Sequence, residues 1–262
     1  MKRFLLLSAI LFLMFTLEAQ KNKKYPEMVF VKGGSFMMGS NEGYDDEKPI
    51  HKVILDDFYI SKYEITVAQY REFCKATGHK FPDKPDAEWY QEHKGVKKWE
   101  WIDNHPIVNV TWYDAMEYCK WLSKITGDEY SLPTEAQWEY AARGGQKSHG
   151  YKYAGSNNIN EVAWYDETTY ERGTQPVGLL KPNELGLYDM SGNATEWCLD
   201  GYGPYPNKTL KNPVLHKKSK YKVVRGGNWY YVDEFCRVTE RDGPKPTEKK
   251  FVYGFRVVKK AK

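Results

Sequence analysis

Three segments of the chain repeat hydrophobic residues with the spacing of an amphipathic helix. Each segment begins with a threonine, and an amide or acidic side chain three residues later can return a hydrogen bond to that cap. Each also ends at a glycine, which readily takes the left-handed conformation that closes a helix. These signals predict helices over residues 66–78, 111–127 and 134–144, capped by Thr66 with Gln69, Thr111 with Asp114 and Thr134 with Gln137.

Short runs rich in Val, Ile, Tyr and Phe indicate strands between and after these helices. The connections are long and contain many Gly, Asn, Pro and Asp residues. Such loops are uncommon in a compact domain, and a bound metal ion is one device that could order them. Nine Trp and 21 Tyr residues predict a core built on large aromatic side chains. The strand-like runs cover residues 52–65, 223–227 and 253–258.

The first residues have the pattern of a secretory signal peptide. Lys2 and Arg3 precede an apolar run, and Ala19 stands before a polar stretch. The alternative is an uncleaved membrane anchor, for which the apolar run is short. The predicted cut is not followed by a cysteine, so a lipoprotein is not expected. We therefore expect a secreted or periplasmic protein with a signal peptide at 1–19, a linker at 20–27 and one domain at 28–260, because no linker-like composition interrupts the rest.

The charge of the chain excludes one large class of partner. Its net charge of +4 is spread in clusters of mixed sign, whereas nucleic-acid-binding proteins concentrate positive charge on one face. Short lysine-rich runs are usually solvated loops. We expect the partner to be an exported protein or peptide, with no nucleic acid and no membrane span after signal cleavage.

Cysteine and histidine patterns limit the possible chemistry. Four cysteines in an exported chain allow up to two disulfides, in three possible connectivities, and the absence of CxxC argues against a zinc knuckle. The six histidines lack metal-site spacing, so a three-histidine iron centre would need long-range convergence. No GxSxG, P-loop or GxGxxG pattern occurs. The residues concerned are Cys74, Cys119, Cys198 and Cys236, and His51, His79, His93, His105, His149 and His216.

Several longer motifs occur in an order that resembles the formylglycine-generating enzyme family, also called sulfatase-modifying factors. The resemblance runs from about Met28 to Val258. It implies a single α+β domain with a C-type-lectin-like core, little regular secondary structure and bound calcium. The motifs are VFVKGGSFMMGS, FYISKYEITVAQYREFC, HPIVNVTWYDAMEYCKWL, SLPTEAQWEYAARGG, NELGLYDMSGNATEW, RGGNW and YGFRV.

The segment LYDMSGNATEW is the candidate calcium site. Asp189 and Glu196 offer hard oxygen ligands on either side of the flexible Gly192, which suits calcium. The alternative is a polar turn in which the two carboxylates accept hydrogen bonds from backbone amides. The resemblance implies that Asp189, Gly192, Ala194 and Glu196 bind calcium, the two small residues through their carbonyls. For a second calcium site Asn160 matches one ligand, but no acidic residue stands where the other is expected.

The resemblance also locates the family's copper site, and here the chain departs from the pattern. Formylglycine-generating members carry two cysteines that hold copper as thiolates. In this chain Cys236 matches the second cysteine, while Tyr231 stands at the first. A phenol cannot replace a thiolate for copper(I). Asn228, Val232 and Thr195 stand at the positions of the family's active-site serine, histidine and tryptophan. We therefore expect no copper, and we expect Cys236 to be a structural thiol or half of a disulfide.

These observations favour an exported, non-catalytic or re-purposed member of the family that acts as a binding or assembly module. The segment WYYVDEF, residues 229–235, combines aromatic and acidic residues and is our first choice for a partner surface. The alternative function is a formylglycine-generating oxidase that acts on a cysteine of exported sulfatases.

Overall fold

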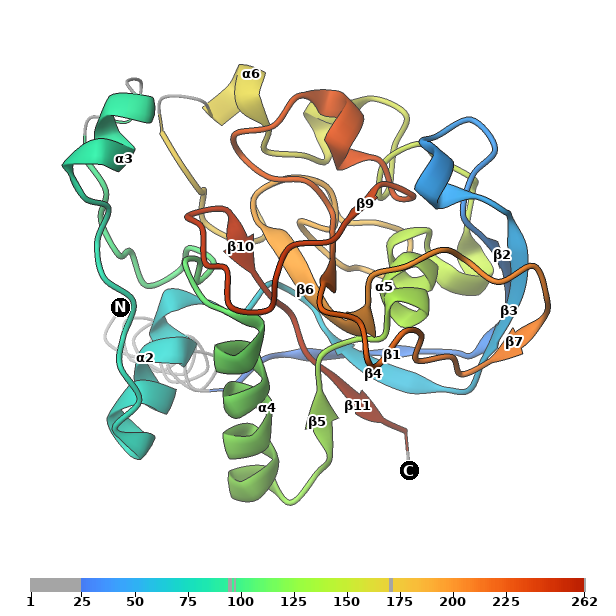
Figure 1. Cartoon of the computed structure of the whole chain (residues 1–262), viewed down its shortest axis with the longest axis horizontal. Helices are drawn as coiled ribbons and strands as arrows, with labels where there is room; N and C mark the ends of the chain where they lie inside the picture. Colours follow the sequence, from blue (N-terminus) through green and yellow to red (C-terminus); the bar gives the residue numbers. More distant parts are fainter. Residues whose placement is uncertain (1–24, 94–95, 97, 170–171, 262) are drawn as a thin grey trace, which may run out of the picture.

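The computed structural model describes residues 25–93, 96, 98–169 and 172–261 (Figure 1). The predicted signal peptide and most of the predicted linker lie outside these residues. The described helices are α2 (Val67–Thr77), α3 (Ala87–Glu92), α4 (Trp112–Thr126), α5 (Glu135–Ala142) and α6 (Asp166–Thr169), with short 3-10 turns η1 (Asp45–Glu47), η2 (Gly145–Lys147), η3 (Ile159–Glu161) and η4 (Asp233–Cys236).

The described strands form three small sheets. One has the order β1-β4-β11-β5, a central one the order β10-β6-β8-β9, and a third the order β2-β3-β7. Helices and strands therefore mix in one α+β arrangement with long connections, as the sequence predicts. The strands are β1 (Met28–Val31), β2 (Gly34–Met38), β3 (His51–Leu55), β4 (Phe58–Ser61), β5 (Tyr130–Ser131), β6 (Thr195–Gly201), β7 (Leu210–Lys211), β8 (Lys222–Arg225), β9 (Arg241–Asp242), β10 (Tyr253–Gly254) and β11 (Val258–Lys260).

The three predicted helices are confirmed as α2, α4 and α5. All three capping boxes form, and α2 and α4 end at Gly78 and Gly127 in the left-handed conformation. The third helix ends at Ala142 instead of continuing to Gly144, because the chain turns directly into η2. The short α3 and α6 are not in the prediction.

Two of the predicted strands are wrong, because each of them is divided into two strands in the structure. The run 52–65 divides into β3 and β4, which belong to different sheets. The carboxylate of Asp57 accepts a hydrogen bond from the backbone N–H of Gly33 at 2.8 Å, which holds the break between them. The run 253–258 likewise divides into β10 and β11. Alternating apolar residues identify extended chain, but they do not show where one strand leaves a sheet and another begins.

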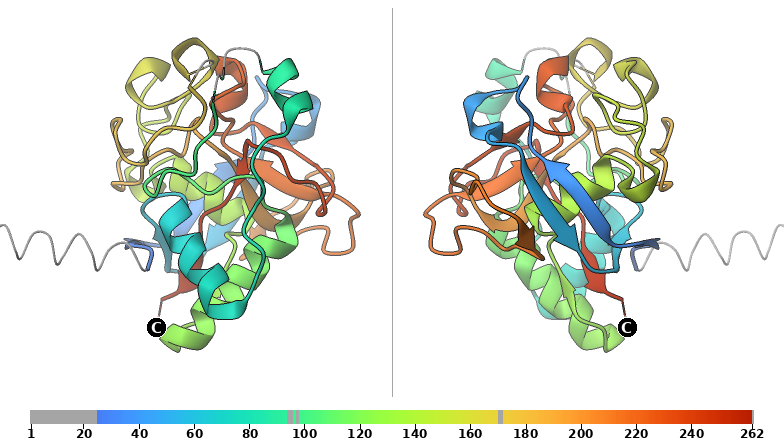
Figure 2. Two further views of the ribbon diagram at one scale, coloured as in Figure 1. Left: turned by 90° about the vertical axis from the view of Figure 1, so that its left-hand side faces the viewer. Right: turned by 90° about the vertical axis from the view of Figure 1, so that its right-hand side faces the viewer.

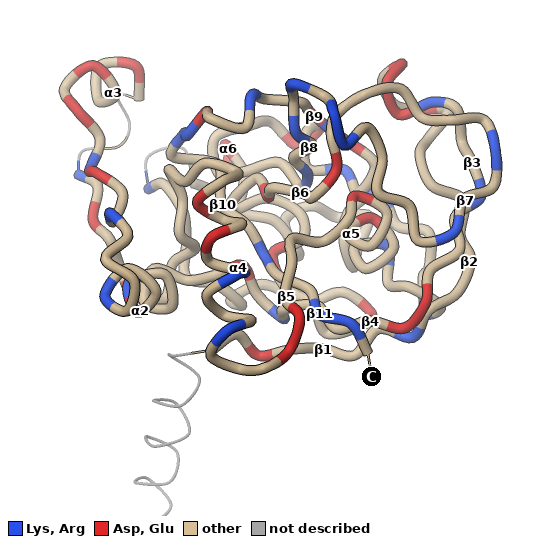
Figure 3. The backbone as a smooth tube through the Cα atoms, turned by 60° about the horizontal axis from the view of Figure 1, so that its bottom comes forward, with Lys and Arg blue, Asp and Glu red and all other residues tan. Residues whose placement is uncertain are grey.

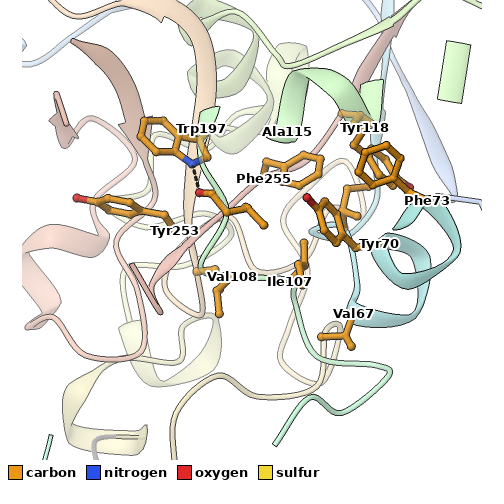
Figure 4. Close-up of a cluster of buried hydrophobic side chains, with 14 of the residues drawn as sticks. Val67, Tyr70, Phe73, Ile107, Val108, Ala115, Tyr118, Trp197, Tyr253 and Phe255 are labelled. Carbon is orange, nitrogen blue, oxygen red and sulfur yellow. Dashed lines mark hydrogen bonds between the residues drawn. The ribbon is translucent and has the colours of Figure 1, made fainter. Parts of the chain in front are cut away.

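Large aromatic side chains fill the core, as the composition predicts. Tyr70 of α2 and Tyr118 of α4 stack with ring centroids 6.0 Å apart, and both rings contact Phe255 (Figure 4). The indole of Trp197 in β6 donates a hydrogen bond to the carbonyl of Val110 at 3.0 Å. These contacts attach α2 and α4 to the central sheet.

The two long helices α2 and α4 lie at the opposite end of the molecule from the turns η1 and η4 (Figure 2). The turns η1 and η4 and helix α3 gather at one end, while α2, α4 and β11 lie at the other. Positive and negative residues are interspersed along the chain (Figure 3). In the described parts of the chain, no helix combines the length and the apolar character needed to cross a bilayer.

A buried ion-pair network joins α5 to the central sheet. Arg225 of β8 donates to the carboxylate of Glu139 at 2.5 Å, and Arg241 of β9 pairs with Glu135 at 2.6 Å. The side chains of Arg225, Arg241, Glu135 and Glu139 are at most 1% exposed. Both oxygens of each carboxylate accept hydrogen bonds, so these acids are buried with partners.

Candidate functional site

The predicted calcium residues lie in a buried cluster of acids beneath the turn between Asp189 and Glu196. Both oxygens of Glu196 are bonded to Arg256 at 2.7 Å, and one of them also accepts from the indole of Trp138 at 2.7 Å. A third carboxylate, that of Glu64, accepts from the backbone N–H of Ala194 at 2.8 Å. The cluster thus gathers three carboxylates around one arginine.

The Asp189 carboxylate has only part of its hydrogen bonding satisfied. Its Oδ2 accepts from the backbone N–H of Gly178 at 2.7 Å, but Oδ1 is buried without a partner. Burial raises the pKa of Asp189 to about 6. Burial, together with the charges of Asp189 and Glu196, also raises the pKa of Glu64 well above its usual range. An excess of buried carboxylates and an orphaned oxygen are what a cation would satisfy, so the residues at this turn fit a calcium ion.

The fit depends on backbone oxygens, because the acids alone do not form a metal cluster. Over the described residues, no group of three or more His, Cys, Asp or Glu side chains is placed to hold a metal ion. An ion at this turn would therefore take Asp189 and Glu196 with the carbonyls of Gly192 and Ala194. Asn160, the candidate for a second calcium, is exposed in η3, and its side-chain oxygen accepts from the Tyr165 hydroxyl at 3.0 Å.

Cys236 is enclosed in the core at the end of η4. Its side chain is 0% exposed, and a Cβ added to Gly227 would lie 2.8 Å from its sulfur. Gly227 has φ 67, so this glycine both makes the turn and leaves room for the thiol. Burial, with the charges of Glu240 and Asp233, raises the pKa of the Cys236 thiol far above its ordinary value. A thiolate, the form that binds copper, is thus strongly disfavoured here.

The other substituted positions are occupied by a local hydrogen-bond chain. The Asn228 amide donates to the Thr195 hydroxyl at 2.9 Å, and that hydroxyl donates to the Gly227 carbonyl at 3.1 Å. The Asn228 side-chain oxygen accepts from the backbone N–H of Tyr230 at 3.0 Å. Val232 is 45% exposed on the surface. Asn228 and Thr195 therefore stabilise the turn by bonding to each other and to its backbone.

All four cysteines are buried as free thiols, so the disulfides that the sequence allows are not present in the structure. Cys74 and Cys119 lie in the aromatic core between α2 and α4, Cys198 lies in the core beneath α5, and Cys236 lies in a third, smaller cluster. The four thiols are thus distributed over three hydrophobic clusters, where they act as small apolar side chains.

A cavity of about 580 Å³ opens beside the degenerate copper position. Tyr231 and Thr195, two of the substituted positions, line it together with Gly227. We call it the Glu240 cavity, because the Glu240 carboxylate lies in its wall. Its other walls come from η1, η4, β9 and β10 and include Tyr44, Asp46, Tyr202, Phe235, Asp242 and Tyr253.

Glu240 is the most unusual side chain of this cavity. It is 7% exposed, yet no described residue forms a hydrogen bond or an ion pair with its carboxylate. Burial raises the pKa of Glu240 to about 8, and the nearby Asp242 adds to the shift while Arg225 and Arg237 oppose it. A buried acid without a partner is costly and commonly marks a functional position.

A second cavity, of about 700 Å³, lies under α3 and shares Tyr231 with the first. Trp89 of α3 stacks on His93 with ring centroids 4.2 Å apart, and Tyr230 and Phe251 complete an aromatic wall. Lysines and acids surround this wall in similar number, so its rim has no single charge.

The segment 229–235, predicted to be a partner surface, separates the two cavities. Trp229 is fully buried and belongs to the core, so the prediction is wrong for this residue. Tyr230 and Tyr231 face the α3 cavity, and Tyr231 and Phe235 line the Glu240 cavity. The segment presents its aromatic residues to two concave sites and only Val232 and Glu234 fully to the surface.

Sequence reasoning missed both Glu64 and Glu240. Glu64 lies near the end of the strand-like run 52–65, two residues before the Thr66 cap, where a single acid is a weak signal. Glu240 follows the cysteine that drew attention to this region, but its burial depends on the packing of η1, β9 and β10. Neither position has a spacing that would identify it.

Comparison with known proteins agrees with the fold. The family of sulfatase-modifying factor enzyme 1-like domains matches residues 15–261. The chain is 32% identical over 280 residues to the formylglycine-generating enzyme of Streptomyces coelicolor, covering 87% of each chain. It is 33% identical over 275 residues to the chaperone protein LppX of Paenibacillus barcinonensis, covering 86% of each.

The chain is also similar to a protein kinase sequence and to a solved structure. The chain is 33% identical over 258 residues to the serine/threonine-protein kinase pkn1 of Chlamydia pneumoniae, which covers 92% of this chain but only 40% of the kinase's length. The structure of PvdO from Pseudomonas aeruginosa superposes with a TM-score of 0.73 at 30% identity, covering 90% of this chain and 95% of PvdO. The α+β, C-type-lectin-like fold that the sequence resemblance implies is therefore confirmed.

Proposed function

The chain belongs to the family of sulfatase-modifying factor enzyme 1-like domains, and we propose that it is a re-purposed member that binds an exported protein or peptide. The observation that carries the proposal is the burial of Cys236 behind Gly227, with Tyr231 in place of a second thiol. The cavity that Tyr231 lines has tyrosine rings and the Glu240 carboxylate in its wall. These groups suit binding better than copper chemistry.

The alternative, a formylglycine-generating oxidase, requires a copper site that these residues do not supply. Copper(I) favours soft thiolate ligands, and a linear site needs two of them. Burial raises the pKa of the Tyr231 phenol, as it does that of the Cys236 thiol, so both groups stay protonated. Activating Cys236 would require ionising a fully enclosed sulfur.

We further propose that calcium stabilises the fold at the turn containing Asp189, Gly192, Ala194 and Glu196. The orphaned oxygen of Asp189 and the excess of buried carboxylates support this site. A bound calcium ion would supply positive charge and would order the turn that leads into β6. The export part of the proposal is supported by the signal-like pattern of residues 1–19.

A peptide-oxidation experiment tests the proposed function. The purified protein is given copper, oxygen, a reductant and a peptide with the CxPxR motif of sulfatases, and conversion of cysteine to the aldehyde is followed by mass spectrometry. We expect no conversion and no stoichiometric copper. Conversion above a control without protein would overturn the binding-module proposal.

Two variants at one position sharpen this experiment. Tyr231→Cys adds the missing thiol and should increase copper binding more than turnover, because Asn228, Thr195 and Val232 still differ from the family's pattern. Tyr231→Phe is the matched control, since it keeps the ring and adds no sulfur. Equal copper binding by the two variants would contradict the assignment of this position.

A further inference from the structure

We infer that the Glu240 cavity binds a primary ammonium group, the group that a lysine side chain of the partner carries. This inference rests on the proposed function and names the chemistry of the partner that the cavity recognises. The cavity combines a carboxylate without a hydrogen-bond donor, two tyrosine hydroxyls, aromatic walls and an excess of acidic residues.

The Glu240 carboxylate supplies the central acceptor. Glu240 is only 7% exposed and lines the cavity. None of the described residues donates a hydrogen bond to its carboxylate. Its backbone is fixed on both sides, because its carbonyl accepts from Arg225 at 2.7 Å and its N–H donates to Arg237 at 3.2 Å. The acid is held in place and available to a donor that enters from outside.

Two hydroxyl groups of the cavity are also available. The phenol oxygens of Tyr231 and Tyr253 form no hydrogen bond with any described residue, although both residues line the cavity. Burial raises the pKa of each phenol, so both remain neutral and can accept through oxygen. An ammonium group has three donors, and a carboxylate with two hydroxyl oxygens offers acceptors for them.

Aromatic rings form a continuous side of the same cavity. The Tyr231 ring lies 5.2 Å from that of Phe235, and Phe235 stacks on Tyr44 with centroids 6.3 Å apart. Such faces attract a cation and cover the methylene groups of a lysine side chain. An anionic ligand would gain nothing from them.

The charges of the wall favour a cation as well. Asp46, Glu240 and Asp242 face one arginine, Arg241, whose guanidinium is already paired with the buried Glu135. Asp46 accepts from the Tyr202 hydroxyl at 2.6 Å and Asp242 accepts from the backbone N–H of Gly243 at 2.6 Å, so of these three acids only Glu240 has a carboxylate that accepts no hydrogen bond from a described residue. A quaternary ammonium has no N–H group, so it could not form a hydrogen bond with Glu240. A guanidinium has five N–H donors, which is more than the acceptors that the cavity offers.

Titration calorimetry with capped tripeptides tests the inference. Peptides with a central lysine, arginine or norleucine, and n-butylamine as the isolated group, are titrated at about pH 8.5, where Glu240 is ionised and a lysine ammonium of pKa about 10.4 keeps its charge. We expect the lysine peptide to bind more tightly than the arginine peptide, and the norleucine peptide not to bind. Binding of n-butylamine alone assigns recognition to the side chain rather than to the peptide backbone.

A matched pair of variants assigns binding to the cavity. Glu240→Gln removes the charge and should weaken the lysine peptide by about tenfold or more, as expected when a buried charge loses its partner. Glu129→Gln makes the same change at an exposed acid that pairs with Lys260 away from the cavity, and should leave affinity unchanged. A melting curve checks that Glu240→Gln is folded.

Three results would overturn the inference: equal binding of lysine and norleucine peptides, tighter binding of arginine, or equal effects of the two glutamine variants. Each of these leaves the proposed function standing if the copper and oxidation experiment is negative. Conversion of the sulfatase peptide would instead overturn the proposed function, whatever the ammonium titration shows.

Discussion

Two neighbouring residues of this chain illustrate opposite ways of burying charge. Arg241 enters the network beneath α5, where it forms two hydrogen bonds with Glu135. Glu240, one residue earlier, lies in a cavity wall without a partner. Burial alone raises the pKa of Glu135, but Arg241 and Arg225 outweigh burial and hold that pKa below its usual range. Nothing offsets the burial of Glu240 to the same extent, and its pKa rises to about 8.

The presence or absence of hydrogen-bond donors distinguishes the buried acids that support the fold from those that line a candidate binding site. A buried acid with a full set of donors contributes to one fixed arrangement of elements, here α5 against the central sheet. A buried acid without donors lowers the stability of the folded protein and is retained where a ligand uses it. The turn that contains Asp189 and Glu196 lies between these cases, because Arg256 pairs with Glu196 while one oxygen of Asp189 has no donor.

The largest expected effect comes from breaking the paired region. Arg225→Met should lower the free energy of unfolding by about 3–5 kcal/mol, because it leaves the Glu139 carboxylate buried and without its charged partner. Urea denaturation measures this loss. The exposed pair Lys260 and Glu129 gives the control, since Lys260→Met should change stability by less than about 1 kcal/mol. Similar losses for both variants would remove the distinction between scaffold and surface charges.

The next largest expected effect is that of calcium on the free energy of unfolding, through the turn that contains Asp189 and Glu196. A free calcium concentration a hundredfold above the dissociation constant should stabilise the folded protein by about 2.7 kcal/mol, and a chelator should reverse the gain. Melting curves with and without calcium measure the difference. Asp189→Asn should abolish it and is preferable to a change at Glu196, which would also leave Arg256 buried without its partner. Superimposable curves for the unmodified protein would argue against the calcium site.

Glu240→Gln should increase stability, in a way that depends on pH. Because the folded pKa of Glu240 is about 8 and its unfolded value is near 4.5, the unmodified protein loses stability as pH rises between these values. The gain from Glu240→Gln should therefore be absent near pH 4 and reach roughly 1–3 kcal/mol above pH 8, within the limit set by the size of the shift. Urea denaturation across this pH range measures it. A gain that does not change with pH would mean that Glu240 is not buried as an unpaired acid.

The smallest expected effect concerns the thiols. All four cysteines are buried and free, so a thiol reagent should react little with the native protein and should detect four thiols after denaturation. Cys236→Ala should lower stability by about 1 kcal/mol, as for loss of a small buried group. Fewer than four thiols in the denatured, unreduced protein would show that disulfides form. Rapid reaction of Cys236 in the native state would contradict its placement behind Gly227.

Local signals in the sequence determined the helices and the turn before Cys236. Capping boxes and closing glycines act within a few residues, so α2, α4 and α5 follow from Thr66, Thr111 and Thr134 and their partners. The same holds for the Gly226 and Gly227 turn. The substitution of Tyr231 at the copper position is likewise readable without a structure.

Only the tertiary structure decided which strands pair and which acids meet. The run 52–65 is one apolar pattern, yet its two halves join different sheets, because pairing depends on partners as distant as β11 and β7. Glu64, Asp189 and Arg256 are far apart in the chain, and Glu240 becomes buried only when η1 packs near β9. Electrostatic energy depends on distance and on solvent exclusion, and neither is set by local sequence. The sequence therefore places Tyr231 where the resemblance expects a second cysteine, and only the packing shows the cavity in whose wall Glu240 lies.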